Sequence, residues 1–184
     1  LFVWEANGVS TDASYGGLPM QNVGQFNRFT LYRLINPAIG INTLTITPNN
    51  SYRPRLQIGI AHYSNVDQIT PNETPQSTFV DGGNYSNVAA HIATPFVNVS
   101  VGNEALGVGV SGYSNSTGVS SGTVIAFVNQ FSLGRRSSDG QIVFTGGGGS
   151  RYWSAIVVIN AVASAAAPFV HDPKARNFAS HLAQ

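Results

Sequence analysis

Short runs of apolar and β-branched residues recur along the whole chain, and Gly, Pro, Asn or Asp separates each run from the next. A spacing of about 10 to 15 residues between such runs is typical of all-β proteins, because strands are short and tight turns need these punctuating residues. We expect strands over residues 1–6, 18–24, 27–35, 41–47, 54–63, 77–80, 94–100, 104–113, 121–131, 140–145 and 152–162.

The pattern inside the runs indicates how the strands are layered. FTLYRLI and NTLTIT alternate between apolar and polar residues, as strands do when one face is buried and the other is wet. ALGVGV and SAIVVINAV are apolar on both faces, as central strands are. The sequence therefore predicts an all-β fold of two packed antiparallel sheets.

One predicted strand carries glycine at alternate positions. Gly107 and Gly109 leave one of its faces without side chains, which indicates the close approach of another backbone or of a large aromatic ring. Trp153 and Tyr113 are the aromatic residues that we expect to fill the space.

The composition excludes several classes of function. A chain of 184 residues that is 42% hydrophobic can bury the core of one domain. Charged residues make up only 9% and the net charge is +1, without a basic cluster, so nucleic acid is not an expected partner. No apolar stretch is long enough to span a membrane. The neutral Asn, Ser and Thr-rich surface favours an extracellular or virion location.

The two ends of the chain suggest contacts with partners. Leu1 and Val3 belong to an apolar run that starts without a preceding methionine, so we expect that an upstream segment has been removed and that a sheet edge is left open. Residues 163–184 form an extension in which Pro173 begins a short amphipathic helix. Phe178 and Leu182 on that helix need a surface to cover them, either on the same chain or on a neighbour.

The ordered segments ASYGGLPM, RFTLYRLINPAIGINTLTIT, LQIGIAHYSNVDQITP, NEALGVGV and RYWSAIVVINA carry a resemblance to a known group of modules. The chain resembles the jelly-roll, concanavalin-like β-sandwich modules of phage virion proteins and large secreted bacterial proteins. The resemblance covers about residues 1–162 and implies a jelly-roll sandwich over that range, with the helical tail beyond it. It ties the motif S-x-x-D-Q-x-x-P to the architecture of the module.

Asp67 is the central residue of that motif, and two interpretations are open. Its position between Asn65 and a following proline favours an Asx turn, in which the carboxylate accepts backbone N–H groups. The alternative interpretation is that Asp67 is a ligand in a calcium site. Hard cations such as calcium bind several oxygen ligands. Asp67, Asn65 and Asp81 could supply those oxygens if the fold brings them together.

The residues that catalysis would require are not arranged in a recognisable pattern. No pair among the three glutamates has the spacing of a glycosidase acid and base. The serines include no G-x-S-x-G nucleophile motif, and the four histidines have no known metal spacing. We therefore expect a protein that is not an enzyme and that needs no cofactor apart from the calcium considered above.

Three tyrosines in polar loops are candidate binding residues. Tyr52, Tyr85 and Tyr113 lie beside Asn, Ser, Gly and Arg, a combination that suits sugars and protein partners alike. The first functional hypothesis is a structural subunit or surface module of an extracellular or virion assembly, which binds copies of itself or other assembly proteins. The second is a carbohydrate-binding or host-adhesion module.

Overall fold

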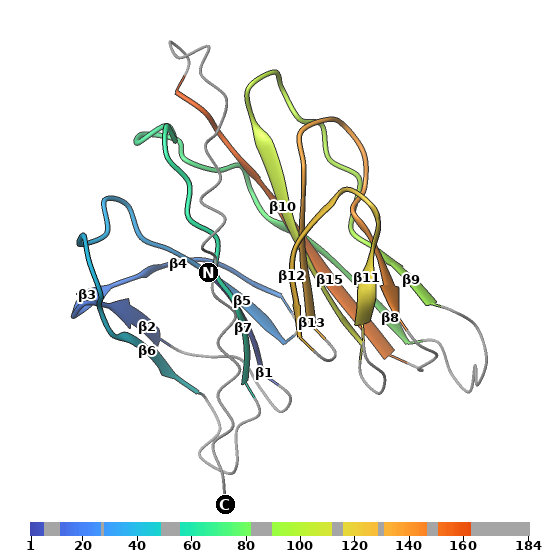
Figure 1. The fold of residues 1–184 in the computed structure, drawn as a ribbon, viewed down its shortest axis with the longest axis horizontal. Coiled ribbons are helices and arrows are strands. Elements are labelled where there is room, and N and C mark those ends of the chain that lie inside the picture. Colours follow the sequence, from blue (N-terminus) through green and yellow to red (C-terminus); the bar gives the residue numbers. More distant parts are fainter. Residues whose placement is uncertain are drawn as a thin grey trace, which may run out of the picture. The chain divides into compact units, whose positions relative to one another are not determined.

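The computed structural model describes residues 1–5, 12–26, 28–48, 56–81, 90–111, 116–128, 131–146 and 151–162. Within these ranges every regular element is a strand, and the strand pairs with a defined register are antiparallel (Figure 1). The described part thus holds no helix that could cross a membrane. The chain divides into two compact units, the first formed by Leu1–Ile58 and the second beginning at Gly59. The prediction of an all-β antiparallel protein is confirmed.

The first unit contains seven short strands in two sheets, and the last strand leads into the second unit. The strands are β1 (Phe2–Glu5), β2 (Asp12–Tyr15), β3 (Leu18–Pro19), β4 (Gln21–Phe26), β5 (Phe29–Arg33), β6 (Leu44–Thr47) and β7 (Leu56–Gly59). One sheet has the order β4-β5-β1-β7 and the other the order β3-β2-β6. Val3, Ala13 and Tyr32 form the buried core of this unit.

The glycine pair after β2 makes a tight turn. Gly16 and Gly17 have φ angles of 59° and 78°, and they join Tyr15 to its register partner Leu18. Both angles lie in the left-handed region that glycine adopts without a steric penalty. A two-residue loop of this kind matches the twist of an antiparallel hairpin.

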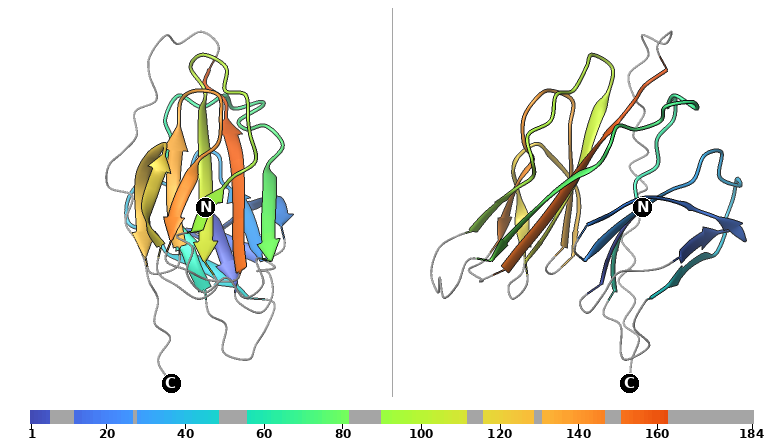
Figure 2. Two further views of the ribbon diagram at one scale, coloured as in Figure 1. Left: turned by 90° about the vertical axis from the view of Figure 1, so that its right-hand side faces the viewer. Right: turned by 180° about the vertical axis from the view of Figure 1, so that it is seen from behind.

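The second unit contains a five-stranded and a three-stranded sheet, visible side by side in Figure 2. Its strands are β8 (Gln76–Asp81), β9 (Ala90–Ala93), β10 (Glu104–Ser111), β11 (Ser116–Ser121), β12 (Thr123–Val128), β13 (Phe131–Arg136), β14 (Val143–Gly146) and β15 (Arg151–Ile159). The sheet orders are β12-β13-β10-β15-β8 and β11-β14-β9. All eight residues of β10 are buried, which confirms the predicted central strand.

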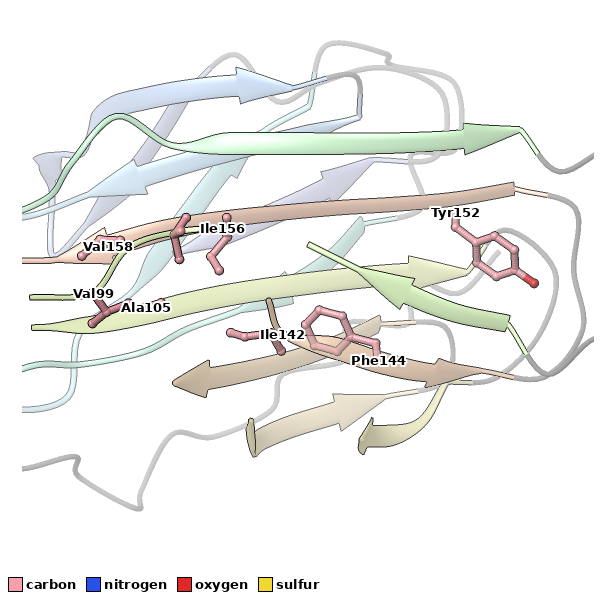
Figure 3. Packing of buried hydrophobic residues seen from close by; sticks show 8 residues of the cluster. Val99, Ala105, Ile142, Phe144, Tyr152, Ile156 and Val158 are labelled. Atoms are coloured by element: carbon pink, nitrogen blue, oxygen red, sulfur yellow. The ribbon is translucent and has the colours of Figure 1, made fainter. Parts of the chain in front are cut away.

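The core of the second unit joins its two sheets (Figure 3). Ile142 and Phe144 approach β10 from the three-stranded sheet, and a Cβ built on Gly109 would lie 2.5 Å from Cδ2 of Phe144. A real Cβ contact is never so short, so the ring occupies the space that the missing side chain leaves. The prediction of an aromatic ring against this face is confirmed. The ring belongs to Phe144, so the prediction of Trp153 is wrong. Tyr113, the other residue predicted to fill the space, lies outside the described residues.

Three predicted strands differ from the structure. The predicted strand over 18–24 is two strands, β3 and β4, which belong to different sheets. The predicted strand over 121–131 is two strands, β12 and β13, which form a hairpin with Val128 opposite Phe131. The predicted strand over 94–100 is reduced to one bridge between Val97 and Gly140, because Pro95 has no N–H for a regular ladder. The regular strand in this part of the chain is β9, which ends at Ala93, directly before the predicted range.

The prediction that one face of the strand is buried and the other exposed to solvent holds for NTLTIT but not for FTLYRLI. In β6 the threonines are exposed and the leucine and isoleucine are partly buried, as expected. In β5 the prediction is wrong, because Phe29, Thr30, Leu31 and Tyr32 are all buried. β5 is an interior strand between β4 and β1, whereas β6 lies at a sheet edge.

The predicted helix of the C-terminal extension falls on residues 163–184, which lie outside the described residues. The division into a sandwich over 1–162 and an extension beyond it stays a prediction.

Candidate interaction surfaces

The SNVDQITP segment is a turn built around the carboxylate of Asp67. Its Oδ1 accepts the backbone N–H of Ile69 at 2.7 Å and that of Thr70 at 3.0 Å. Its Oδ2 accepts the hydroxyl of Thr70 at 3.2 Å. These bonds confirm the Asx turn.

The same hydrogen bonds determine the charge of the turn. The amides of Thr70 and Ile69 hold the pKa of the Asp67 carboxyl below its ordinary value, because they bond to the ionised form. Asp67 therefore keeps a full negative charge on an exposed turn at neutral pH.

The calcium alternative stays a prediction. Asn65 has a left-handed backbone with a φ of 58°, and its carbonyl accepts the N–H of Val162 at 3.0 Å. Asp81 ends β8, opposite Arg151 in the strand register. Among the described residues no three His, Asp or Glu side chains gather into a possible metal site.

Asn160, directly after β15, ties the Asp67 turn to the rest of the second unit. Its backbone N–H donates to the carbonyl of Pro71, and its carbonyl accepts the N–H of Asp67. Its side-chain Nδ2 donates to the carbonyl of Thr70 at 2.7 Å, while its Oδ1 accepts from Nδ2 of Asn103 at 3.0 Å. One asparagine thus fixes two turns that are far apart in the sequence.

These two turns, and the residues that follow β15, carry exposed apolar side chains. Ile69 is 92% exposed and Val101 is 105% exposed. Val162, two residues after Asn160, is 37% exposed. We call these three residues the apolar tip. Isolated apolar residues on a surface are ordinary, but here hydrogen bonds to Asn160 and Asn103 hold the turns that carry them.

β8 is an edge of the five-stranded sheet, and among the described strands only β15 pairs with it. Its sequence, QSTFVD, contains no proline, no glycine and no lysine. The opposite edge, β12, has a register irregularity between Val124 and Ala126. Natural sheets protect their edges with such irregularities, prolines and charges, so β8 is the less protected edge.

An aromatic residue on β8 adds to its apolar character. Phe79 is 43% exposed and stacks on Trp153, with ring centroids 5.4 Å apart and an interplanar angle of 24°. An exposed ring fixed by a buried one is a contact surface of low conformational entropy.

The first unit has an apolar loop of its own. Ile39 and Ile41 are 102% and 105% exposed on either side of Gly40. Nδ2 of Asn42 donates to the carbonyls of Ala38 and Gly40, at 3.2 Å and 3.4 Å, and so braces the loop.

A buried polar group lies at the start of β10. Glu104 is 6% exposed, and its Oε1 accepts the hydroxyl of Tyr63 at 2.9 Å. Its Oε2 accepts from a guanidinium nitrogen of Arg135 at 3.3 Å. Burial, and then the neighbouring carboxylate, raise the pKa of Tyr63. The group satisfies buried polar atoms in the core, as the interior of a protein requires.

The sequence-predicted binding residues divide between described and undescribed parts of the chain. Tyr52, Tyr85 and Tyr113, and likewise Pro173, Phe178 and Leu182, lie outside the described residues. Their predicted roles stay predictions, as does the glycan hypothesis.

Leu1 and Val3, the two N-terminal residues predicted to bind a partner, lie in the first unit. Val3 is 1% exposed and belongs to the core, and Leu1 packs against that core. The Leu1 amine donates to the carbonyl of Tyr32 at 3.1 Å, and burial lowers its pKa to about 5. Their role in binding a partner stays a prediction.

Sequence reasoning missed Asn160, Asn103, Tyr63 and Arg135 as organising residues. For Asn160 a signal was present, because a single asparagine interrupts the apolar run AIVVINAV. A buried amide needs hydrogen-bond partners, and here these are the two turns. The polar group around Glu104 had no local signal, because its members are distant in the sequence.

Comparison of the chain with protein-family models, with curated proteins and with solved structures gives no match.

Proposed function

We propose that the chain is a non-enzymatic structural module of an extracellular or virion assembly, which binds other copies of itself through a sheet edge. The C-terminal extension is the second element of contact. The jelly-roll connectivity that the sequence motifs imply belongs to this proposal, as do the location outside the cell and other assembly proteins as further partners.

The observation that carries the proposal is the edge of β8, with which only β15 pairs among the described strands. An edge strand offers a row of backbone N–H and C=O groups to any strand laid beside it. Six residues without proline, glycine or lysine can accept such a strand along their whole length. The low content of charged residues, 9%, reduces the repulsion between copies.

The proposal is tested by the mass of the protein in solution as a function of concentration, measured by light scattering. Ser77 is the second residue of β8, and Ser137 lies exposed in the loop after β13. We expect the wild-type chain and the Ser137→Lys control to form species heavier than one chain of 19.4 kDa. We expect Ser77→Lys to weaken association at least tenfold, because a lysine on an edge strand opposes strand addition.

Two results would contradict the proposal. One is a wild-type chain that stays monomeric at every concentration, and the other is an equal effect of both lysines. Gln76→Lys, at an exposed position of β8, is the second edge variant if Ser77→Lys lowers the melting temperature.

A further inference from the structure

Hydrogen bonds hold the turns that carry the apolar tip of the second unit, and its side chains are exposed in the described part of the chain. Asn160 fixes the turn of Ile69 through the carbonyl of Thr70, and Asn103 bonds both Oδ1 of Asn160 and the N–H of Ala161. The exposed fractions of Ile69 and Val101, 92% and 105%, mean that the fold itself does not use these side chains.

The charged side chains of the segment that carries Ile69 are all negative. Asp67 and Glu73 lie in the segment that carries Ile69, and both residues are outside the core. From Tyr63 to Asp81 the sequence contains no lysine or arginine. A partner segment that combines apolar residues with basic ones would complement this end of the unit.

The C-terminal segment of the chain has that chemistry. Residues 173–184, PKARNFASHLAQ, place Phe178 and Leu182 four residues apart, on one face of the helix that the sequence predicts. Lys174 precedes Phe178 by one turn, and Arg176 adds a second positive charge. A helix of about this length is marginal alone in water and gains stability by docking its apolar face.

The connecting stretch is long enough to reach another copy. Ten residues, 163–172, separate Val162 from Pro173. An extended chain covers at most about 3.3 to 3.6 Å per residue, so this stretch reaches about 30 Å from the apolar tip.

We propose that the apolar tip of one copy, formed by Ile69, Val101 and Val162 and flanked by Asp67 and Glu73, binds the segment Pro173–Gln184 of a neighbouring copy. The apolar tip of one copy binds the tail of the next, so the same contact can repeat from copy to copy instead of ending at a closed dimer. It rests on the proposed role in assembly and names a second contact, independent of β8.

The test is complementation between two full-length variants, both made in the Ser77→Lys background so that edge pairing does not contribute. The tip variant carries Ile69→Ser and Val101→Ser, and the tail variant carries Phe178→Ser and Leu182→Ser. Each variant retains one half of the contact. We expect each alone to sediment as a monomer, and their equimolar mixture to form a species of twice the mass of one chain.

The matched control is Ile39→Ser with Ile41→Ser, two equally exposed isoleucines on the loop of the first unit. We expect this control, in the Ser77→Lys background with an intact tip and tail, to associate as the unmodified background does. We expect Glu73→Gln to weaken association a few-fold at low salt and to have a smaller effect at high salt, where surface charges are screened.

A mixture of tip and tail variants that stays monomeric overturns the inference, and so does a control that loses association equally. Association of the tail variant with itself also overturns it, because its tail is the part removed. Failure of β8 pairing appears separately, as association that Ser77→Lys leaves unchanged.

Discussion

At the residue scale, the Asp67 turn is the clearest link between a sequence motif and its geometry. A carboxylate that accepts two backbone N–H groups organises the turn and prefers to be ionised. Since the pKa of Asp67 is lowered in the folded chain, the unfolded chain takes up its proton at a higher pH. The stability that the carboxylate contributes is full above the unfolded value of 3.8 and is lost as pH falls through the folded pKa.

The lowered pKa of Asp67 predicts that Asp67→Ala lowers the free energy of unfolding near pH 7, and that the difference from wild type shrinks as pH falls from 3.8 towards the folded pKa. Asp67→Asn keeps a neutral acceptor for the turn and does not titrate, so it should lose less stability than Asp67→Ala near pH 7 and should lack this pH dependence. Urea unfolding of the three proteins at about pH 7 and about pH 3 measures both effects. A constant difference between wild type and Asp67→Ala across this range would contradict the prediction.

Asn160 is the residue whose removal should loosen the apolar tip. Asn160→Ala loses the side-chain bonds to Thr70 and Asn103, at about 0.5 to 1.5 kcal/mol each, so we expect a loss of about 1 to 2 kcal/mol of stability. Hydrogen exchange at the amides of Ile69 and Thr70 should accelerate more than exchange in β10. Asn160→Asp, which keeps the acceptor, should show a smaller effect at Asn103. Uniform acceleration across the unit would contradict a local role.

At the element scale, the packing of β10 against Phe144 makes a prediction about glycine. Gly109→Ala places a Cβ about where the ring lies, so we expect a loss of about 1 to 3 kcal/mol from overpacking. Gly107→Ala meets the mobile end of Ile142 at 2.9 Å and should cost less. Phe144→Leu should recover part of the loss in the Gly109→Ala protein, as measured by a double-mutant cycle in urea. A purely additive double variant would mean that the ring is not the cause.

The same elements show why some features could be predicted from the sequence and others could not. The central strand β10 and the Asp67 turn follow from local patterns, and both were predicted. β11, whose sequence is STGVSS, carries no apolar run and is a strand because it pairs with β14. The hairpin of β12 and β13 was predicted as one strand, because no glycine or proline separates its two apolar runs.

The candidate surfaces were predictable only in part. The tail could be suspected from its amphipathic pattern, but the apolar tip depends on turns more than 30 residues apart in the sequence that meet at Asn160. Local patterns report which residues lie in turns, whereas tertiary hydrogen bonds decide which turns come together.

At the scale of the whole molecule, the account describes a module that joins copies in two ways, through the edge of β8 and through the apolar tip. Hydrogen exchange of β8 as a function of protein concentration tests the central claim directly, because strand addition protects edge amides that no described strand covers. We predict that amides within Gln76–Asp81 gain protection as concentration rises, in wild type and in Ser137→Lys but not in Ser77→Lys. Association that leaves exchange in β8 unchanged would contradict the account.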